Sequence, residues 1–188
     1  FFKPPTILGH EFFGTVFKAP RGCGFHTGDI VVAAPYCECG KCLTCLRASG
    51  ELCREKSFVP QGAFCEYVGI PTDYISKGIF RVDREDDVYT LVEPLACVIN
   101  GTEHLRLNRY SKALIVGSGP MGALFALLLR SKGIPVAVIE PSAVRRELIS
   151  SWGIECYEPG QADIGAFDNI VIAVNKAELV SEYTLKIA

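Results

Sequence analysis

The stretch "KALIVGSGPMG", Lys112–Gly122, decides the fold of the second half of the chain. An apolar run typical of a buried strand leads into glycines spaced as G-x-G-x-x-G, and an apolar helix pattern closed by Gly133 follows. Glycines between a strand and a helix permit a tight turn and let a pyrophosphate approach the first helical N–H groups. The stretch therefore predicts the first unit of a dinucleotide-binding domain.

The next predicted strand, "IPVAVIE", ends in an acidic residue, Glu140, 18 residues beyond Gly122 (140 − 122). An acid at this place accepts hydrogen bonds from the adenosine ribose and repels a 2′-phosphate, so it favours NAD over NADP. Arg145 and Arg146 follow, and an arginine there could hold such a phosphate; because the acid comes first, we interpret both as the solvated face of a helix. The candidate cofactor residues are Gly117, Gly119, Pro120, Met121, Gly122, Glu140 and Arg145.

The remainder of this half alternates helices and strands. "SAVRRELISSWG" predicts a helix with Ser142 as its N-cap, "IECYE" and "FDNIVIAVN" predict strands, and "KAELVSEYTLKIA" predicts a last helix. Strands that alternate with helices imply a parallel, doubly wound sheet.

The first half has a different character. Short β-branched and aromatic runs such as "FFGTVF", "DIVVAAPY" and "GAFCEYVGI" stand among Gly, Pro and Cys residues, which predicts short strands joined by turns. The segment at 91–112 predicts a helix that crosses between the halves. We therefore expect an α/β protein with an all-β lobe at 1–97 and a dinucleotide-binding domain at 98–188.

The all-β lobe contains the cysteine-rich stretch "CGKCLTCLRASGELC", Cys39–Cys53. Structural zinc needs four thiolate or imidazole ligands, and a loop supplies them when ligand pairs sit two or three residues apart. Redox-active C-x-x-C pairs open a helix in a βαβ unit, which these do not, and an iron–sulfur cluster is the other rival. Nine cysteines in a chain without a signal peptide favour metal over disulfides. The predicted zinc ligands are Cys39, Cys42, Cys45 and Cys53.

Composition narrows the choice of partners. The chain has 188 residues, 49% of them hydrophobic, with a formal net charge of −2, which gives no reason to expect nucleic acid or an anionic membrane as partner. The longest apolar run, "GALFALLL", is too short to span a bilayer. The N-terminal residues lack a basic region and a cleavage site, so we expect a cytoplasmic protein.

Two further patterns are weak when each is taken alone. His10 and Glu11 follow Gly9 in "LGHEFFGTV", and a lone histidine is usually a core or surface residue. Glu93 precedes Pro94 in "VEPLACV", where an acid also fits the first turn of a helix.

Taken together, these motifs resemble the zinc-dependent medium-chain dehydrogenase/reductase family over nearly the whole sequence. "GHEFFGTV", "GDIVV", "GAFCEY" and "GSGPMG" resemble motifs of that family, and the cysteine stretch matches its structural-zinc lobe in every spacing. "EPLACV" points to the branch of polyol, threonine and sugar dehydrogenases.

The resemblance implies a GroES-like, partly open β-barrel joined to a Rossmann domain that binds NAD. It also implies a catalytic zinc held by His10, by Glu11 as an interchangeable neighbour, and by Glu93 directly or through water. The implied reaction moves a hydride between NAD and a secondary alcohol, which is a polyol, sugar or hydroxy-amino acid. The implied assembly is a homodimer or homotetramer.

The sequence also departs from the family pattern. The family's first catalytic ligand and its Ser/Thr proton relay stand before the GHE motif, and neither is in this sequence. The sequence begins and ends within predicted elements, so we expect a fold truncated at both ends. The alternatives are a zinc-free reductase, which generally lacks the four-cysteine lobe, and a non-catalytic NAD-binding homologue that retains only the structural zinc.

Overall fold

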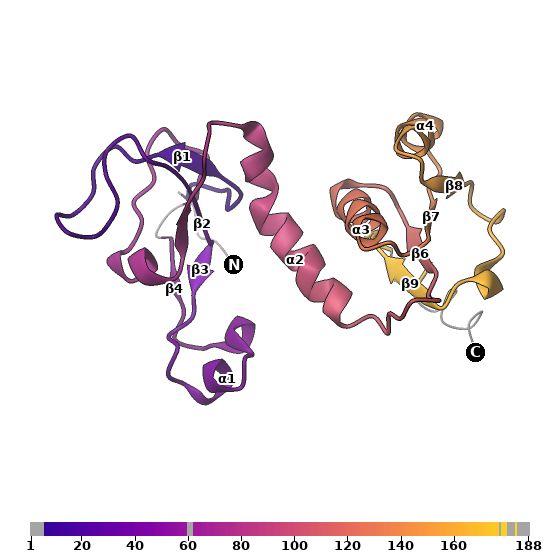
Figure 1. Ribbon diagram of the computed structural model, residues 1–188, viewed down its shortest axis with the longest axis horizontal. Helices are drawn as coiled ribbons and strands as arrows, with labels where there is room; N and C mark the ends of the chain where they lie inside the picture. The colour runs from indigo at the N-terminus through magenta and orange to yellow at the C-terminus, as the bar shows by residue number, and fades with distance from the viewer. Residues whose placement is uncertain (1–5, 60–61, 177, 180–182, 184–188) are drawn as a thin grey trace. The chain divides into compact units, whose positions relative to one another are not determined.

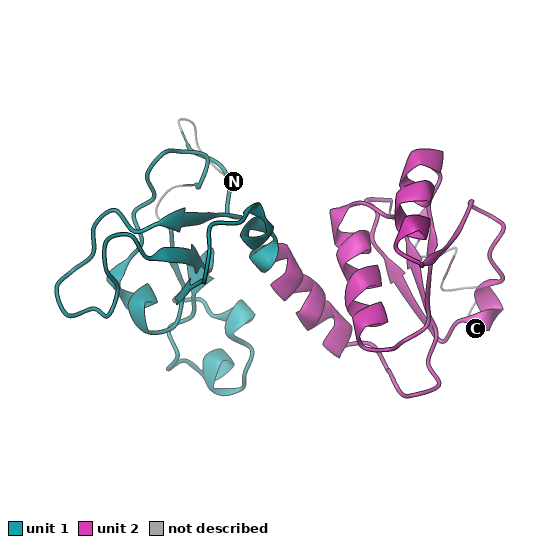
Figure 2. Cartoon of the chain, turned by 45° about the horizontal axis from the view of Figure 1, so that its top comes forward, with its two compact units in different colours: residues 1–93 teal, residues 94–188 magenta. Residues whose placement is uncertain are grey.

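The computed structural model describes residues 6–59, 62–176, 178–179 and 183 of the chain. The chain divides into two compact units, residues 1–93 and 94–188, which Figure 2 draws in teal and magenta.

Unit 1 is built from short antiparallel strands, as the first half of the sequence predicts. Strands β1 (Phe13–Thr15), β2 (Ile30–Ala33) and β5 (Ile79–Arg81) form one sheet in the order β1-β2-β5. Strands β3 (Tyr36–Cys37) and β4 (Ser57–Phe58) pair separately. The remaining elements are short and helical (Figure 1): α1 (Leu43–Leu46), η1 (Gly50–Leu52), η2 (Thr72–Ser76) and η3 (Asp87–Leu91).

A buried tyrosine ties the two sheets of unit 1 together. Tyr74 has no exposed surface and packs with Ala33 and Cys37 in the core. Its hydroxyl lies 3.2 Å from the carbonyl oxygen of Pro35, which directly precedes β3. It also lies 3.2 Å from the carbonyl oxygen of Ser57, the first residue of β4. The phenol is therefore satisfied where it is buried, as buried polar groups require.

The strand predicted over "GAFCEYVGI" does not form among the described residues of that stretch. Instead, three backbone N–H groups at 62–64 donate to carbonyl oxygens at 7–9: Gly62 to Ile7 over 2.9 Å, Ala63 to Gly9 over 3.0 Å, and Phe64 to Leu8 over 2.9 Å. The N–H groups of neighbouring residues all face one segment, whereas in a strand they alternate in direction. The stretch thus braces the residues that lead into His10.

Unit 2 is a four-stranded parallel sheet, and the prediction of a parallel α/β fold is confirmed. Its strands are β6 (Ala113–Val116), β7 (Val136–Ile139), β8 (Glu155–Tyr157) and β9 (Asn169–Ile172), in the order β8-β7-β6-β9. The chain moves outward from β6 to β8 on one side and returns to pair β9 with the other side of β6. The order therefore reverses at β6, and ligands of open α/β sheets bind beyond the carboxyl ends of strands at such a point.

Both faces of this sheet are buried. Helices α3 (Pro120–Ser131) and α4 (Ala143–Ser151) pack on one face through Ala126, Leu129 and Ile149 (Figure 1). The alternate strand residues, including Leu114 and Val116, form a second cluster with Tyr183. This two-sided burial explains why the strands read as continuous apolar runs.

Three other predictions concern helices. Helix α2 (Val92–Glu103) crosses the division between the units, as expected, but it ends well before the end of the predicted segment 91–112. The helix predicted over 176–188 lies for the most part outside the described residues. Ser142 does occupy the N-cap of α4, but its hydroxyl makes no capping hydrogen bond. Within the described part of the chain, no helix is long and apolar enough to cross a membrane.

Candidate metal centres and dinucleotide site

The four cysteines predicted to bind zinc converge on one point in unit 1. The Sγ atom of Cys42 lies 3.4 Å from that of Cys45 and 3.8 Å from that of Cys53, and Cys39 and Cys45 are 3.9 Å apart. A tetrahedral zinc with bonds of about 2.3 Å separates its sulfurs by about 3.8 Å, so the cluster has the size of a zinc site. No disulfide joins any of the nine cysteines, all of which lie among the described residues.

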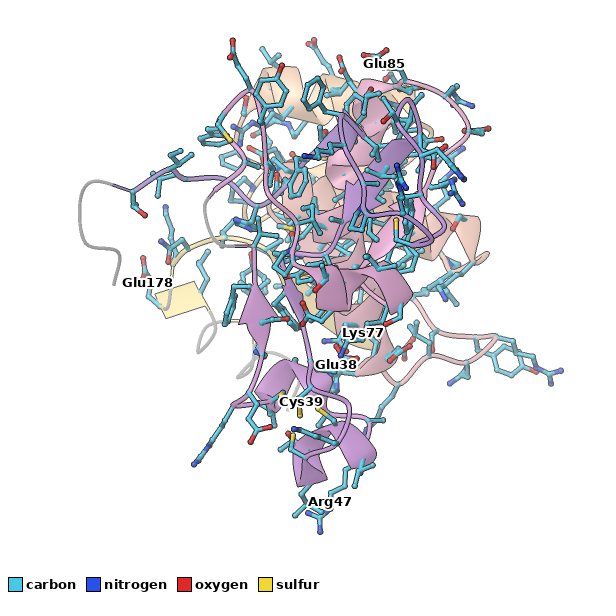
Figure 3. All side chains as sticks on the ribbon, turned by 90° about the vertical axis from the view of Figure 1, so that its left-hand side faces the viewer. Glu38, Cys39, Arg47, Lys77, Glu85 and Glu178 are labelled. Atoms are coloured by element: carbon cyan, nitrogen blue, oxygen red, sulfur yellow. The ribbon has the colours of Figure 1, made fainter. Side chains whose placement is uncertain are left out.

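The loop that carries these thiols is shaped by hydrogen bonds to sulfur. The Cys42 N–H donates to Cys39 Sγ over 3.4 Å, and the Cys39 N–H donates to Cys53 Sγ over 3.5 Å. Figure 3 shows Cys39 among the yellow sulfur atoms of this lobe. The donor set of four thiols with N–H groups aimed at two of them fits a structural zinc, which binds thiolates.

The thiols of this cluster differ in how readily they ionise without a metal. A hydrogen bond with the Thr44 hydroxyl, 3.1 Å away, and further bonds from Cys45 lower the pKa of Cys42 to about 6. Burial and a hydrogen bond with Cys42 raise the pKa of Cys45 to about 12. Zinc binds the thiolate form, so metal binding releases the protons that the four thiols still carry.

A second cluster joins residues that are far apart in the sequence. One ligand atom each of His10, Glu11 and Glu93 lies within 4.8 Å of the others, and His10 Nε2 is 3.9 Å from Glu93 Oε2. His10 and Glu11 are exposed, and Glu93, in the first turn of α2, is half-buried. An imidazole with two carboxylates matches the donor types of catalytic zinc, so the residues present fit that ion.

Gly9 sets the direction of the chain into this cluster. Its φ of +100° lies in the region that favours glycine, and a Cβ there would stand 2.6 Å from the Phe64 ring. Because residues 62–64 are hydrogen-bonded to residues 7–9, the backbone before His10 is fixed by the "GAF" segment. Phe64 belongs to the "GAFCEY" motif on which the family resemblance rests, but that resemblance assigned it no role beside Gly9.

The glycine turn of unit 2 connects β6 to α3 as predicted. Gly117 has a φ of +95°, and a Cβ on Gly122 would lie 2.0 Å from the Gly117 carbonyl oxygen. Gly119, by contrast, directly precedes the first residue of α3, and a Cβ added to it would meet no heavy atom within 4 Å beyond its own chain neighbours. The turn is therefore closed on the protein side and open at Gly119, where a pyrophosphate needs room.

We predict opposite effects for alanine at these two glycines. Gly122→Ala should lower the free energy of unfolding by about 3 kcal/mol, because the new methyl group meets backbone that must move. Gly119→Ala should leave stability nearly unchanged, because its methyl group enters open space. It should weaken nucleotide binding, because that space is where the pyrophosphate would lie. Thermal unfolding and calorimetric titration of both variants check this, and equal destabilisation by both would contradict it.

Glu140 lies beyond β7, and its carboxylate is bound within the turn. Oε2 accepts hydrogen bonds from the Ser118 N–H over 2.9 Å and the Ser118 hydroxyl over 2.8 Å, and Oε1 accepts one from the Ser142 N–H over 2.9 Å. Burial alone raises the pKa of Glu140, but these hydrogen bonds outweigh it, so the pKa lies below its ordinary value of 4.5. Sequence reasoning missed Ser118, because the glycine pattern leaves its position open.

Because the pKa of Glu140 is lowered, the stability that Glu140 contributes should depend on pH. A carboxylate whose pKa falls on folding contributes stability above its unfolded pKa and loses it as pH falls through the folded pKa. Glu140→Gln should therefore lower the free energy of unfolding by about 2 kcal/mol at pH 7, and the difference should shrink below about pH 4. Urea unfolding of both proteins across this range measures it, with the exposed Glu147→Gln as control. A difference that is constant with pH would contradict the prediction.

The two arginines of α4 behave differently from each other. Arg145 is exposed, as predicted. Arg146 is not on the solvated face: its guanidinium donates to the carbonyl oxygens of Glu140 and Pro141 over 2.9 and 2.7 Å, and pairs with Glu158. Its side chain is 19% exposed. The prediction for Arg146 was wrong because a long side chain near the start of a helix can turn back to bind carbonyl groups before it.

Comparisons with known proteins find matches to both units. The family described as the alcohol dehydrogenase GroES-like domain matches residues 1–79, and the FAD binding domain family matches residues 110–156. The second match covers the strand, glycine turn, helix and strand of unit 2. Flavin and nicotinamide nucleotides share this unit, so the match does not distinguish between them.

Two curated relatives are dehydrogenases. A 2-dehydro-3-deoxy-L-galactonate 5-dehydrogenase of Pseudoalteromonas atlantica is 32% identical over 182 residues, 95% of this chain and 53% of that protein. An L-threonine 3-dehydrogenase of Pyrococcus horikoshii is 34% identical over 158 residues, 81% of this chain and 44% of that protein. The chain thus spans about half the length of these relatives.

Solved structures show the same fold. A Sinorhizobium meliloti protein described as a zinc-binding dehydrogenase, solved with NADP, has a TM-score of 0.84 at 27% identity, covering 99% of this chain and 59% of its own. The 2R,3R-butanediol dehydrogenase of Bacillus subtilis has a TM-score of 0.80 at 23% identity, covering 98% and 56%. The four-thiol cluster, the antiparallel and parallel units and the relatives together show the family of the chain. The chain belongs to the zinc-containing medium-chain alcohol dehydrogenase family.

Proposed function

We propose that the full-length protein is a zinc-dependent dehydrogenase that transfers a hydride between NAD and a secondary alcohol on a polyol, sugar or hydroxy-amino acid. The observation that carries the proposal is the meeting of His10, Glu11 and Glu93 in unit 1. These residues have no shared role in packing, because two of the three are exposed. Relatives that act on threonine and on sugar acids support the substrate class.

Each group of this chain has a separate task in the proposal. His10 and Glu93 hold the catalytic zinc, and Glu11 is an alternative ligand beside them. The four cysteines hold the structural zinc that keeps their lobe folded. When bound, the catalytic zinc acts as a Lewis acid toward the substrate hydroxyl, and NAD accepts the hydride.

The nucleotide is assigned to the turn of unit 2. Gly119 is the N-cap of α3 and has open space beside it, and a helix N-terminus attracts a pyrophosphate. Pro120 and Met121 begin the helix, and Glu140 supplies negative charge at the end of β7. We assign NAD rather than NADP because Arg146, the partner that a 2′-phosphate would need besides Arg145, is bound to carbonyl groups and Glu158.

A turnover assay of the full-length protein tests the proposal. The panel holds L-threonine, several polyols and several sugar acids, each with NAD or NADP, with the absorbance of the reduced nucleotide as readout. We expect NAD reduction with at least one of them, loss of the activity with a chelator, and recovery with zinc. Nucleotide binding without turnover, together with a single tightly bound zinc, would instead identify a non-catalytic homologue that keeps only the structural ion.

The proposal also covers the protein's cellular location and its oligomeric state. We infer a cytoplasmic enzyme that assembles as a homodimer or homotetramer, with a small-molecule alcohol as its other partner. Light scattering of the full-length protein after size-exclusion chromatography measures the assembly, and a monomer would reject this part alone.

A further inference from the structure

A serine inside the glycine turn binds the acid at the end of the next strand. Ser118 donates twice to Glu140 Oε2, from its N–H and from its hydroxyl. Ser118 is 8% exposed and Glu140 is 3% exposed, so these hydrogen bonds are shielded from water. The G-x-G-x-x-G pattern does not specify the residue at position 118. The hydroxyl contact is therefore a feature of this chain that the pattern does not predict.

The hydrogen-bonding capacity of Glu140 is nearly filled. A carboxylate has about four lone-pair positions. The two bonds from Ser118 and the one from the Ser142 N–H use three of them. One position on Oε1 is left, whereas the two hydroxyls of an adenosine ribose offer two donors.

The Ser118 hydroxyl can complete the recognition of such a diol. Its proton is directed to Glu140, over 2.8 Å, so its own lone pairs remain as acceptors. Glu140 and Ser118 together then present acceptors to two ribose hydroxyls. A 2′-phosphate has only acceptors to offer, and both donors of Ser118, its N–H and its hydroxyl, are already bound to the carboxylate.

We propose that Ser118 is a specificity-determining residue for the nucleotide: its hydroxyl fixes the Glu140 carboxylate and, with it, selects an unmodified ribose over a 2′-phosphorylated one. This inference rests on the proposed NAD function. It adds a residue to the ribose site, and it makes nucleotide choice depend on the turn as well as on the acid.

Three variants test the role of Ser118 in the full-length protein. Ser118→Ala removes the hydroxyl, and Ser118→Thr keeps it. Ser142→Ala is the matched control, because Ser142 reaches Glu140 only through its backbone N–H and its hydroxyl caps nothing. The first readout needs no nucleotide: NMR titration of the Glu140 carboxyl carbon should give a raised pKa in Ser118→Ala and an unchanged one in the other two.

The second readout is the ratio of the NAD and NADP dissociation constants, measured by calorimetry. The preference for NAD should fall roughly tenfold in Ser118→Ala, the value of one hydrogen bond to a charged group, and should persist in Ser118→Thr and Ser142→Ala. NAD binding with an unchanged ratio in Ser118→Ala overturns the role of Ser118 and leaves the proposed function intact. A wild-type protein that binds neither nucleotide rejects the proposed function itself, and the role of Ser118 with it.

Discussion

Replacing Cys45 by serine is expected to release the structural zinc and unfold the lobe around it. The Sγ atom of Cys45 lies within 3.9 Å of two of the other three thiols, so its loss leaves three thiols where structural zinc takes four ligands. Structural zinc contributes on the order of 10–16 kcal/mol of apparent binding free energy in small zinc-binding peptides, which is comparable to the whole stability of a domain. Even a partial loss should therefore unfold residues 39–53.

Metal analysis and thermal unfolding of the purified chain measure this effect. The matched control is Cys23→Ser, because Cys23 lies outside the cluster and its sulfur accepts the Phe25 N–H over 3.4 Å, a bond that a serine oxygen can also accept. We expect the control to keep its zinc and its melting temperature. A Cys45→Ser protein with full zinc content and unchanged melting would show that the four thiols are not the ligands.

Replacing His10 by alanine should abolish turnover by the full-length protein while leaving its fold intact. The imidazole side chain is 63% exposed, so its loss removes little packing. In the proposed function, however, His10 is a ligand of the ion that would stabilise charge on the reacting oxygen, a contribution of several kcal/mol. We expect kcat to fall about a thousandfold or more, with the structural zinc retained.

His26→Ala provides the control for this variant. His26 is likewise exposed, and its Nδ1 also lies 3.9 Å from a carboxylate oxygen, that of Asp29. Among the described residues it belongs to no group of three metal-binding side chains. Steady-state kinetics and zinc analysis should therefore separate the two variants. Comparable activity in His10→Ala and His26→Ala would remove His10 from the catalytic machinery.

The parts of the fold that sequence predicted correctly are those governed by local patterns. The β6–α3–β7 unit follows from one apolar run, one glycine turn and one apolar helix, all within residues 112–140. The zinc loop follows from spacing, because Cys39, Cys42 and Cys45 stand three residues apart and Cys53 follows in the same short loop. In both cases the residues that make the contacts belong to one short continuous segment.

Contacts between distant segments were not predictable in this way. Glu11 and Glu93 stand 82 residues apart (93 − 11), and only the family resemblance suggested that they meet; the structure places their ligand atoms within 4.8 Å. The bracing of residues 7–9 by residues 62–64 left no periodic signal, since consecutive rather than alternate residues make the bonds. The Ser118–Glu140 contact depends on a side-chain orientation that spacing does not encode.

Counting zinc in the purified full-length protein tests the central claim most directly, namely that unit 1 carries two metal sites of different kinds. Elemental analysis should find two zinc ions per chain, falling to one in His10→Ala and also after brief dialysis against a chelator, since the second cluster is exposed and the thiol cluster is more enclosed. One zinc per chain in the wild-type protein, unaffected by the loss of His10, would contradict the account.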